Sequence, residues 1–349
     1  MALRNIIVIG ASAGGFEALK KLVKGLPKDL AAAVFIVWHL PANAHGVLPS
    51  VLGKEGALPA AHGVDGEEIR TGRIYVAPPD HHLLVEENRV RITKGPKENR
   101  FRPAVDTLFR SAAYACGARV IGVVLSGALD DGTAGLWTIK HRGGTAIVQE
   151  PADAEFSSMP ESALRQVEVD YSVPVSEMGA LLTRLTGEQT LEAREISMDE
   201  NKKTEMEIRI AAEESAFEVG VMGLGEISPF TCPDCHGVLI KIKDGKINRF
   251  RCHTGHAFSA DTLLANITER IEDSMWGAMR EMEESIMLLR EMSKHFAESD
   301  HKQMAELFLQ KGNEAENRVK LIRRVVLEHE QLSENGLRQQ TESGRQKSI

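Results

Sequence analysis

Runs of apolar residues alternate along the first half of the chain with segments whose apolar positions recur every three or four residues. The first run, residues 6–9, contains only β-branched residues, which is typical of a strand buried on both faces. Similar runs follow at 33–38, 73–77, 120–125 and 145–148. Strands that alternate with helices predict an α/β fold with a doubly wound, mostly parallel sheet.

Further elements are predicted between and after these strands. Residues 83–92 have the pattern of a short hairpin that turns at Glu87 and Asn88. Pro103 stands where a proline is favoured, in the first turn of a predicted helix. A last strand and helix complete the α/β part of the chain near Leu185.

The pattern changes after Gly187. Charged residues dominate and apolar periodicity is weak as far as about Ser215, which predicts a solvated linker that is helical in part. Two long helical patterns, 260–296 and 303–327, are joined by a short connection that favours an antiparallel pair. The predicted organisation is an α/β domain at 1–187, a charged linker at 188–228, a cysteine-bearing segment at 229–258, a helical hairpin at 259–331 and a polar tail at 332–349.

Composition and charge narrow the class of protein. The 349 residues, 42% of them hydrophobic, suit one large domain and a smaller one. A net charge of −8 argues against a nucleic-acid partner, which requires a basic surface. No apolar run reaches the length of about 18 residues that a membrane span needs, and residues 1–4 lead directly into the first strand. We therefore expect a cytoplasmic protein without membrane insertion.

A glycine-rich turn at residues 10–15 places Ser12 directly after the first strand. A dinucleotide-binding loop would have glycine at this position, and an acid where the second strand ends in His39. The nucleophile of an α/β-hydrolase would stand deeper in the chain, ahead of its acid and its histidine. The remaining interpretation is a serine hydrolase of another fold, with Ser12 at the carboxyl edge of the sheet.

Three strand ends carry the groups that a serine hydrolase requires, in the order Ser12, His39 and Asp131. A serine hydroxyl is a weak nucleophile until a base accepts its proton, and a carboxylate must fix the tautomer of that base. Adjacent parallel strands lie about 5 Å apart, so side chains at their ends can meet. The order and placement of the three residues predict a catalytic triad.

Five segments then share their residues and their order with one known family. They are Gly-Ala-Ser-Ala-Gly-Gly at 10–15, Trp-His-Leu-Pro at 38–41, Tyr-Val-Ala-Pro-Pro-Asp-His-His at 75–82, Arg-Pro-Ala-Val-Asp-Thr-Leu-Phe at 102–109 and Leu-Ser-Gly-Ala-Leu-Asp-Asp-Gly at 125–132. Together they resemble the catalytic domain of the chemotaxis protein-glutamate methylesterases (CheB) over residues 5–185.

The resemblance implies a chemotaxis signal-transduction enzyme, a carboxylesterase that releases methanol from glutamyl methyl esters. Its partners would be methylated receptor signalling helices, and deamidation of glutamine would be a second activity. The implied triad is Ser12, His39 and Asp131, and catalysis needs no cofactor. Two alternatives stay open: a non-catalytic scaffold, and an esterase in a signalling pathway other than chemotaxis.

The resemblance also assigns supporting residues. The family pattern puts the acid directly before the glycine, which selects Asp131 over Asp130, and His82 matches a family histidine with a supporting role. By analogy with other acyl-transfer sites, the backbone N–H groups of Ala13 and Ala128 are the expected oxyanion donors. Ala13 stands where the family usually has threonine, and Ala128 and Leu129 replace a methionine–glycine pair, which affects substrate identity more than chemistry.

The family's classical members carry a phosphorylatable receiver domain ahead of the esterase, whereas here the first strand begins near residue 5. The resemblance is therefore to a stand-alone form, and we expect no control by a receiver in cis. Helices 260–296 and 303–327 could pack only on each other, or could also provide a surface for a signalling partner.

Three of the four cysteines fall within one short segment, in a spacing typical of a structural zinc site. Cys232, Cys235 and Cys252 provide three ligands, and the fourth is His256 or His253, with His256 favoured by its longer gap from Cys252. A closed shell leaves no position for water, so the zinc is expected to fold a ribbon and not to act in catalysis. The sequence thus predicts that the esterase domain folds and works independently of this segment.

Overall fold

The computed structural model describes residues 3–40, 46–190, 195–333 and 337–338. Its contacts divide the chain into two units, Met1–Leu263 and Leu264–Ile349. Each unit is described by itself below. None of the helices in the described residues is both long and apolar enough to cross a membrane.

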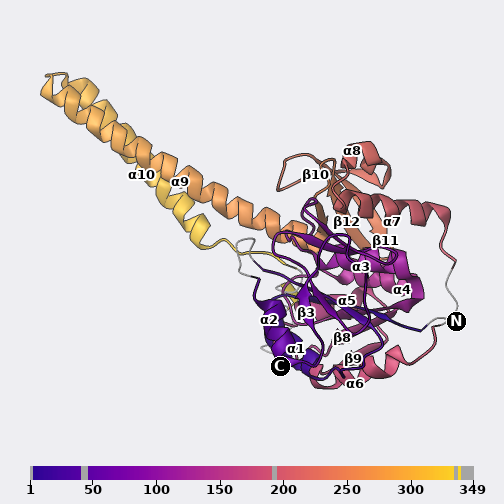
Figure 1. Cartoon of the computed structure of the whole chain (residues 1–349). Helices are drawn as coiled ribbons and strands as arrows, with labels where there is room; N and C mark the ends of the chain where they lie inside the picture. The colour runs from indigo at the N-terminus through magenta and orange to yellow at the C-terminus, as the bar shows by residue number, and fades with distance from the viewer. Residues whose placement is uncertain (1–2, 41–45, 191–194, 334–336, 339–349) are drawn as a thin grey trace, which may run out of the picture. The chain divides into compact units, whose positions relative to one another are not determined.

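A seven-stranded sheet forms the centre of the first unit, within the described residues, in the order β3-β4-β2-β1-β7-β8-β9 (Figure 1). Its strands are β1 (Ile6–Ala11), β2 (Ala33–Trp38), β3 (Ala60–His62), β4 (Ile74–Val76), β7 (Val120–Val124), β8 (Thr145–Gln149) and β9 (Tyr171–Val173). Every neighbouring pair is parallel, which confirms the predicted α/β class. The short strand β3 was not predicted.

Helices cover both faces of this sheet. On one face, Ile7 and Ile9 pack with α1 (Gly15–Lys24), α2 (Leu48–Glu55) and α6 (Val175–Thr186). On the other, Ile6 and Val8 pack with three helices. These are α3 (Val105–Cys116), α4 (Thr133–His141) and α5 (Ser158–Gln166). Successive residues of β1 are therefore buried on opposite faces, which explains why that strand has no polar positions.

Smaller elements join the sheet to the rest of the unit. The predicted hairpin is present as β5 (His82–Val85) and β6 (Val90–Thr93), which pair antiparallel. The 3₁₀ turn η1 (Gly117–Arg119) connects α3 to β7. The hairpin packs against α3, and the loop between them carries Asn99, whose side chain bonds Asp131 beyond the end of β7.

The segment predicted as a charged linker is largely folded where the structure describes it. It contains α7 (Met198–Ala211), α8 (Ala216–Val219) and η2 (Val221–Gly223), and it ends in the first residues of β10. Ser197 and Glu200 form a reciprocal capping box at the start of α7. Because α7 contacts α3, this part of 188–228 is a packed element of the first unit and not a solvated linker; residues 191–194 lie outside the described part.

A four-stranded antiparallel sheet, here called the ribbon, follows in the order β10-β11-β12-β13. Its strands are β10 (Glu226–Thr231), β11 (Val238–Asp244), β12 (Ile247–Cys252) and β13 (Ala257–Ser259). Gly245 lies in the turn between its two central strands and adopts the left-handed φ of 59° that the turn requires.

A buried network of ion pairs between side chains joins the ribbon to α3 and α7. Glu207 of α7 contacts Arg249 at 2.6 Å and Arg251 at 2.8 Å on β12. Glu98 of the loop before α3 contacts Arg251 at 2.6 Å and Arg110 of α3 at 3.0 Å. Removing one partner of such a network leaves an uncompensated buried charge, at a cost of about 3–5 kcal/mol. The ribbon therefore belongs to the same unit as the sheet, which differs from the predicted boundary at residue 187.

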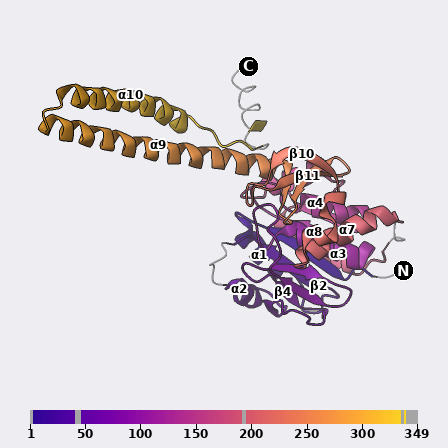
Figure 2. The ribbon, with the colours of Figure 1, turned by 90° about the horizontal axis from the view of Figure 1, so that it is seen from above.

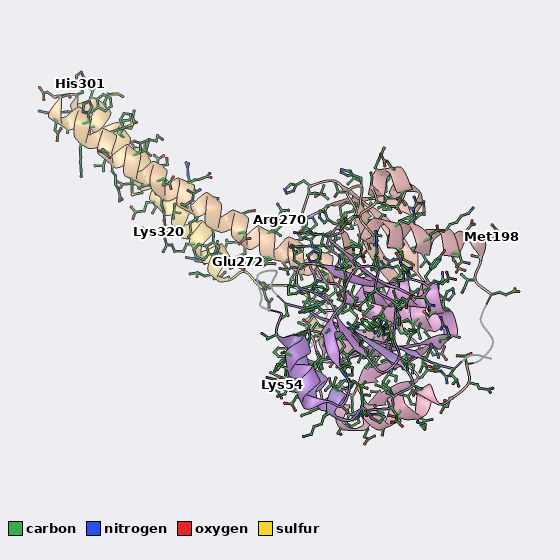
Figure 3. The ribbon with its side chains drawn as sticks, in the orientation of Figure 1. Lys54, Met198, Arg270, Glu272, His301 and Lys320 are labelled. Atoms are coloured by element: carbon green, nitrogen blue, oxygen red, sulfur yellow. The ribbon has the colours of Figure 1, made fainter. Side chains whose placement is uncertain are left out.

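The second unit contains most of α9 (Ala260–Glu298) and all of α10 (Lys302–Leu327), close to the predicted helices. The two helices run antiparallel and lie side by side in both views (Figures 1 and 2), with Phe296 and Phe308 stacked at 5.3 Å. Figure 3 marks His301 at the turn between them and Arg270 toward the other end of α9. The polar tail at 332–349 lies mostly outside the described residues.

Candidate active site

Ser12 follows the last residue of the central strand β1. The turn that holds it uses Gly14, whose φ of 69° is left-handed, and α1 begins one residue later. Two bonds fix its backbone: the Ser12 N–H donates to the Ser126 carbonyl at 3.0 Å, and the Trp38 indole donates to the Ser12 carbonyl at 2.9 Å. The serine is therefore held at the carboxyl edge of the sheet.

His39 follows β2, the strand directly beside β1. Because Ala11 and Trp38 are in register, the next residues of the two strands, Ser12 and His39, face each other. Nδ1 of His39 lies 3.2 Å from Ser12 Oγ, and the imidazole stacks on Phe101 with ring centroids 3.6 Å apart. The ring is thus held in position to accept the serine proton.

Asp131 completes the chain of hydrogen bonds. Its Oδ2 lies 2.8 Å from His39 Nε2 and accepts the Val105 N–H at 2.7 Å, while its Oδ1 accepts the Asp106 N–H at 3.2 Å. These two N–H groups form the N-terminus of α3, where a negative charge is stabilised. Burial alone would raise the pKa of Asp131, but its bonds to His39 and Asn99 lower the pKa below its usual range. The group is therefore an anion at neutral pH.

The bond to Asp131 places the imidazole proton on Nε2 and leaves the lone pair of Nδ1 for the Ser12 hydroxyl. In the familiar serine proteases the two nitrogens have the opposite assignment. The chemistry is the same, because either nitrogen can act as the base when the other is held by a carboxylate. The predicted residues Ser12, His39 and Asp131 are thus brought together in one linear arrangement.

Comparisons with known proteins match the part of the chain that builds this site. The CheB methylesterase family model matches residues 7–182. The chain belongs to this family. A relative in Leptospira interrogans is 39% identical over 180 residues, which are 51% of this chain and 93% of that protein. A protein-glutamate methylesterase/protein-glutamine glutaminase of Methanosarcina acetivorans is 36% identical over 194 residues, 53% of this chain and 54% of its own.

The fold is also similar to that of a solved structure. The crystal structure of the CheB methylesterase catalytic domain of Thermotoga maritima superposes with a TM-score of 0.51 and 32% identity. It covers 53% of this chain and 100% of that domain. The resemblance predicted from the five segments is therefore confirmed at the level of family and fold.

His82, predicted to support this CheB-type site, lies behind it. The side chain is fully buried, with Nε2 2.9 Å from the Pro96 carbonyl and Nδ1 accepting the Ala104 N–H at 3.3 Å. Burial lowers its pKa, so the imidazole is neutral. Its bonds hold the loop that leads into α3, and the first N–H groups of α3 donate to Asp131.

The predicted oxyanion donors lie on the two turns beside Ser12. Neither the Ala13 nor the Ala128 N–H donates a hydrogen bond to another described residue. The Ala13 carbonyl accepts the Ser126 hydroxyl at 2.8 Å, which links the two turns. Neighbouring Leu129 adopts a left-handed φ of 61°, a conformation that shapes the turn carrying Ala128.

Asp130 points away from His39. Its Oδ1 accepts the hydroxyl of Ser259, at the end of β13, at 2.6 Å and that of Thr262, in the first turn of α9, at 3.0 Å. Burial, together with the charges of nearby aspartates, raises the pKa of Asp130 to about 7. The two adjacent aspartates thus have different partners, and only Asp131 contacts the imidazole.

This raised pKa predicts a pH-dependent stability. Between pH 4 and 7 folded Asp130 retains a proton that the unfolded chain has released, so stability falls as pH rises through that window. This pH dependence of the free energy of unfolding amounts to at most about 1.4 kcal/mol per pH unit. It should be absent in Asp130→Asn, which keeps the acceptor oxygen but cannot titrate. Urea unfolding of both proteins at pH 5 and pH 8 measures it. A difference between the proteins that does not change with pH would contradict the expectation.

The cysteine segment brings together the predicted ligand set. One ligand atom from each of Cys232, Cys235, Cys252 and His256 lies within 4.8 Å of all the others. The Cys235 and Cys252 sulfurs are 3.6 Å apart, close to the edge of about 3.8 Å expected for zinc thiolates. His253, the alternative ligand, is not part of this cluster. Three thiols and one imidazole suit a closed tetrahedral zinc site.

Two residues that contact the candidate site, Asn99 and Ser259, were not predicted. Asn99 donates to Asp131 Oδ1 at 2.9 Å, and Ser259 bonds both Asn99 and Asp130. Both lie outside the five segments that carried the resemblance, and they are 160 positions apart, so no local spacing marks their contact.

Proposed function

We propose that this CheB-family chain is a protein-glutamate methylesterase in which Ser12 is the nucleophile, His39 the base and Asp131 the residue that orients the base. The observation that carries the proposal is the continuous line of hydrogen bonds from Ser12 Oγ through the imidazole to the Asp131 carboxylate. A scaffold that had lost activity would have no use for this arrangement, which argues against the non-catalytic alternative.

In the first half-reaction, Ser12 Oγ attacks the ester carbonyl while its proton moves to His39 Nδ1. The tetrahedral oxyanion would lie against the Ala13 and Ala128 N–H groups, donors worth about 3 kcal/mol each in comparable sites. The imidazolium returns the proton to the leaving oxygen, and methanol departs from an acyl-serine. Water, deprotonated by His39, then attacks the acyl group and releases the glutamate carboxylate and free Ser12.

The proposed substrates are glutamyl methyl esters on receptor signalling helices, with glutamine side chains as a second substrate. The names of the relatives, which pair methylesterase with glutaminase, support this substrate class. Both substrates form the same γ-glutamyl acyl-serine and differ only in whether methanol or ammonia leaves. We place the protein in the cytoplasm, together with these receptor helices. Esters in a signalling pathway other than chemotaxis would use the same chemistry.

Matched peptides test the substrate class. A peptide with one glutamyl methyl ester should release methanol, the same peptide with glutamine should release ammonia more slowly, and the aspartyl methyl ester should be the poorest substrate. Methanol and ammonia are measured enzymatically over the same time course. Equal rates on the aspartyl and glutamyl esters would mean that the site is a general esterase and would overturn the assignment.

We also propose that Cys232, Cys235, Cys252 and His256 hold a structural zinc ion, since their donor atoms fit a tetrahedral shell. When bound, the metal would contribute folding free energy to the ribbon. Catalysis itself needs no cofactor, because the base, nucleophile and oxyanion donors are all supplied by the chain.

For the hairpin of α9 and α10 we propose binding to the helical bundle of the receptor. Its core is thin, formed by Met279, Ile286 and Val319, while Met287 and Leu321 are more than half exposed. Helical receptors present apolar and polar stripes of the kind that such a surface can cover.

Met287→Glu combined with Leu321→Glu is therefore expected to lower the turnover of an intact receptor fragment several-fold and to leave a small ester unaffected. Gln303→Glu, at another exposed position on α10, is the control for added charge. Receptor turnover is measured as methanol release. Unchanged turnover in the double variant would contradict the proposal that the hairpin binds the receptor.

A further inference from the structure

The side chain of Asn99 lies between two buried carboxylates. Its Nδ2 donates one hydrogen to Asp131 Oδ1 and the other to Asp106 Oδ2, each at 2.9 Å. Asn99 is 3% exposed, so water does not compete for these bonds. The amide is therefore a neutral double donor placed between two groups that would otherwise repel each other.

The ribbon fixes the orientation of this amide. The Ser259 N–H, at the end of β13, donates to Asn99 Oδ1 at 2.8 Å. An amide held in this way must direct its NH₂ group, and not its oxygen, toward Asp131 and Asp106. The backbone is held as well, because the Asn99 N–H donates to the Ala257 carbonyl at 2.8 Å. Asn99 has a left-handed φ of 50°, which these contacts stabilise.

Asp106 is the second buried carboxylate that Asn99 contacts. Burial, and then the charge of Asp131, raise the pKa of Asp106 well above its usual range. Its Oδ1 already accepts the Gly132 and Gly135 N–H groups. Asn99 supplies the donor on the side that faces Asp131, and it prevents the two carboxylates from meeting directly.

We propose that Asn99 is a positioning residue of the esterase: it holds the Asp131 carboxylate in line with His39, and β13 of the ribbon holds Asn99. The proposal rests on the triad argued above and adds to it a residue that acts through Asp131. Apart from His39 and Asn99, the donors to Asp131 are backbone N–H groups: that of Val105 bonds Oδ2, and those of Asp106 and Gly132 bond Oδ1. Asn99 adds a side-chain donor to Oδ1.

Two substitutions test whether Asn99 positions Asp131 or only attaches the ribbon. Asn99→Ala removes every side-chain bond, whereas Asn99→Asp still accepts the Ser259 N–H but can no longer donate to Asp131 as an anion. If Asn99 positions the acid, both variants should lose about 10–100-fold in kcat, with KM changed less than threefold. If Asn99 serves only to attach the ribbon, Asn99→Asp should keep near-wild-type kcat, and that result would overturn the proposal.

A double-mutant cycle tests whether the effect passes through Asp131. Asn99→Ala should cost less than threefold in the Asp131→Asn background, because the carboxylate that it orients is then absent. An equal loss in both backgrounds would mean that Asn99 acts elsewhere. Thermal unfolding is recorded for each protein, so that a fall in kcat is read only from folded variants.

The same variants distinguish a failure of the proposed triad from a failure of the proposed role of Asn99. If Asp131→Asn alone hydrolyses the ester at the wild-type rate, the proposed triad fails. If Asp131→Asn is slow but Asn99→Ala and Asn99→Asp are both fast, the triad stands and the positioning role of Asn99 fails.

Discussion

Replacing Ser12 with alanine is expected to lower the hydrolysis of a small glutamyl methyl ester by at least about 10³-fold, because no other group takes its place as nucleophile. Asp131→Asn should lower kcat by about 10²–10⁴-fold, since an amide cannot hold His39 in the tautomer that frees Nδ1. Initial rates of methanol release measure both effects. The fold should survive Ser12→Ala, because the serine is fixed through its backbone.

Asp130→Asn is the matched control for the acid. It changes the neighbouring carboxylate in the same way, but Asp130 contacts Ser259 and Thr262 and not the imidazole. Its kcat should stay within about threefold of wild type. Near-wild-type turnover by Ser12→Ala, or equal losses in the two aspartate variants, would exclude the proposed assignment.

Removing the proposed zinc ion from the ribbon is the second change with a large expected effect. The sequence alone led us to expect that small-ester hydrolysis would survive it. The contacts of β13 with Asn99 lead to the opposite expectation, a loss of about tenfold or more in kcat. Cys252 and His256 flank the turn between β12 and β13, and the Cys252 N–H bonds the His256 carbonyl at 3.0 Å. Without the metal, this turn loses the constraint that presents β13 to Asn99.

Cys235→Ser and a chelated wild-type protein provide two independent routes to the metal-free state. Metal content, hydrogen exchange of residues 229–258 and the rate on a small ester are measured on the same samples. Cys116→Ser, a cysteine of α3 far from the ligand set in sequence, is the control for loss of a thiol. Full activity in a metal-free protein whose ribbon has lost its protection would show that the ribbon does not support the site.

The parts of the fold that were predicted correctly are those that local patterns encode. The apolar runs of β1, β2 and β7 are long, and they end in residues whose chemistry can be recognised. Once the strands are parallel, their carboxyl ends must share one edge, so the approach of Ser12 to His39 follows from the register. In contrast, β3 has three residues, too few for a periodic signal.

The predicted linker was wrong in its described part because charge does not always mark solvated chain. Glu207 on α7 is 4% exposed, and its charge is balanced by arginines of the ribbon and of α3. Composition alone cannot distinguish a glutamate in such a network from one in water. The contact between the ribbon and the site could not be predicted from the sequence either, because Ser259 and Asn99 are separated by 160 positions.

The most direct test of the central claim is a rapidly acid-quenched reaction between the protein and a receptor fragment carrying glutamyl methyl esters. We predict that mass spectrometry finds a γ-glutamyl acyl group on the peptide containing Ser12, and that this species accumulates in Asp131→Asn. Methanol should appear in an amount equal to the acyl-enzyme in the first turnover, and neither should appear with Ser12→Ala. Methanol release by Ser12→Ala at the wild-type rate, or an acyl group on another residue, would contradict the account.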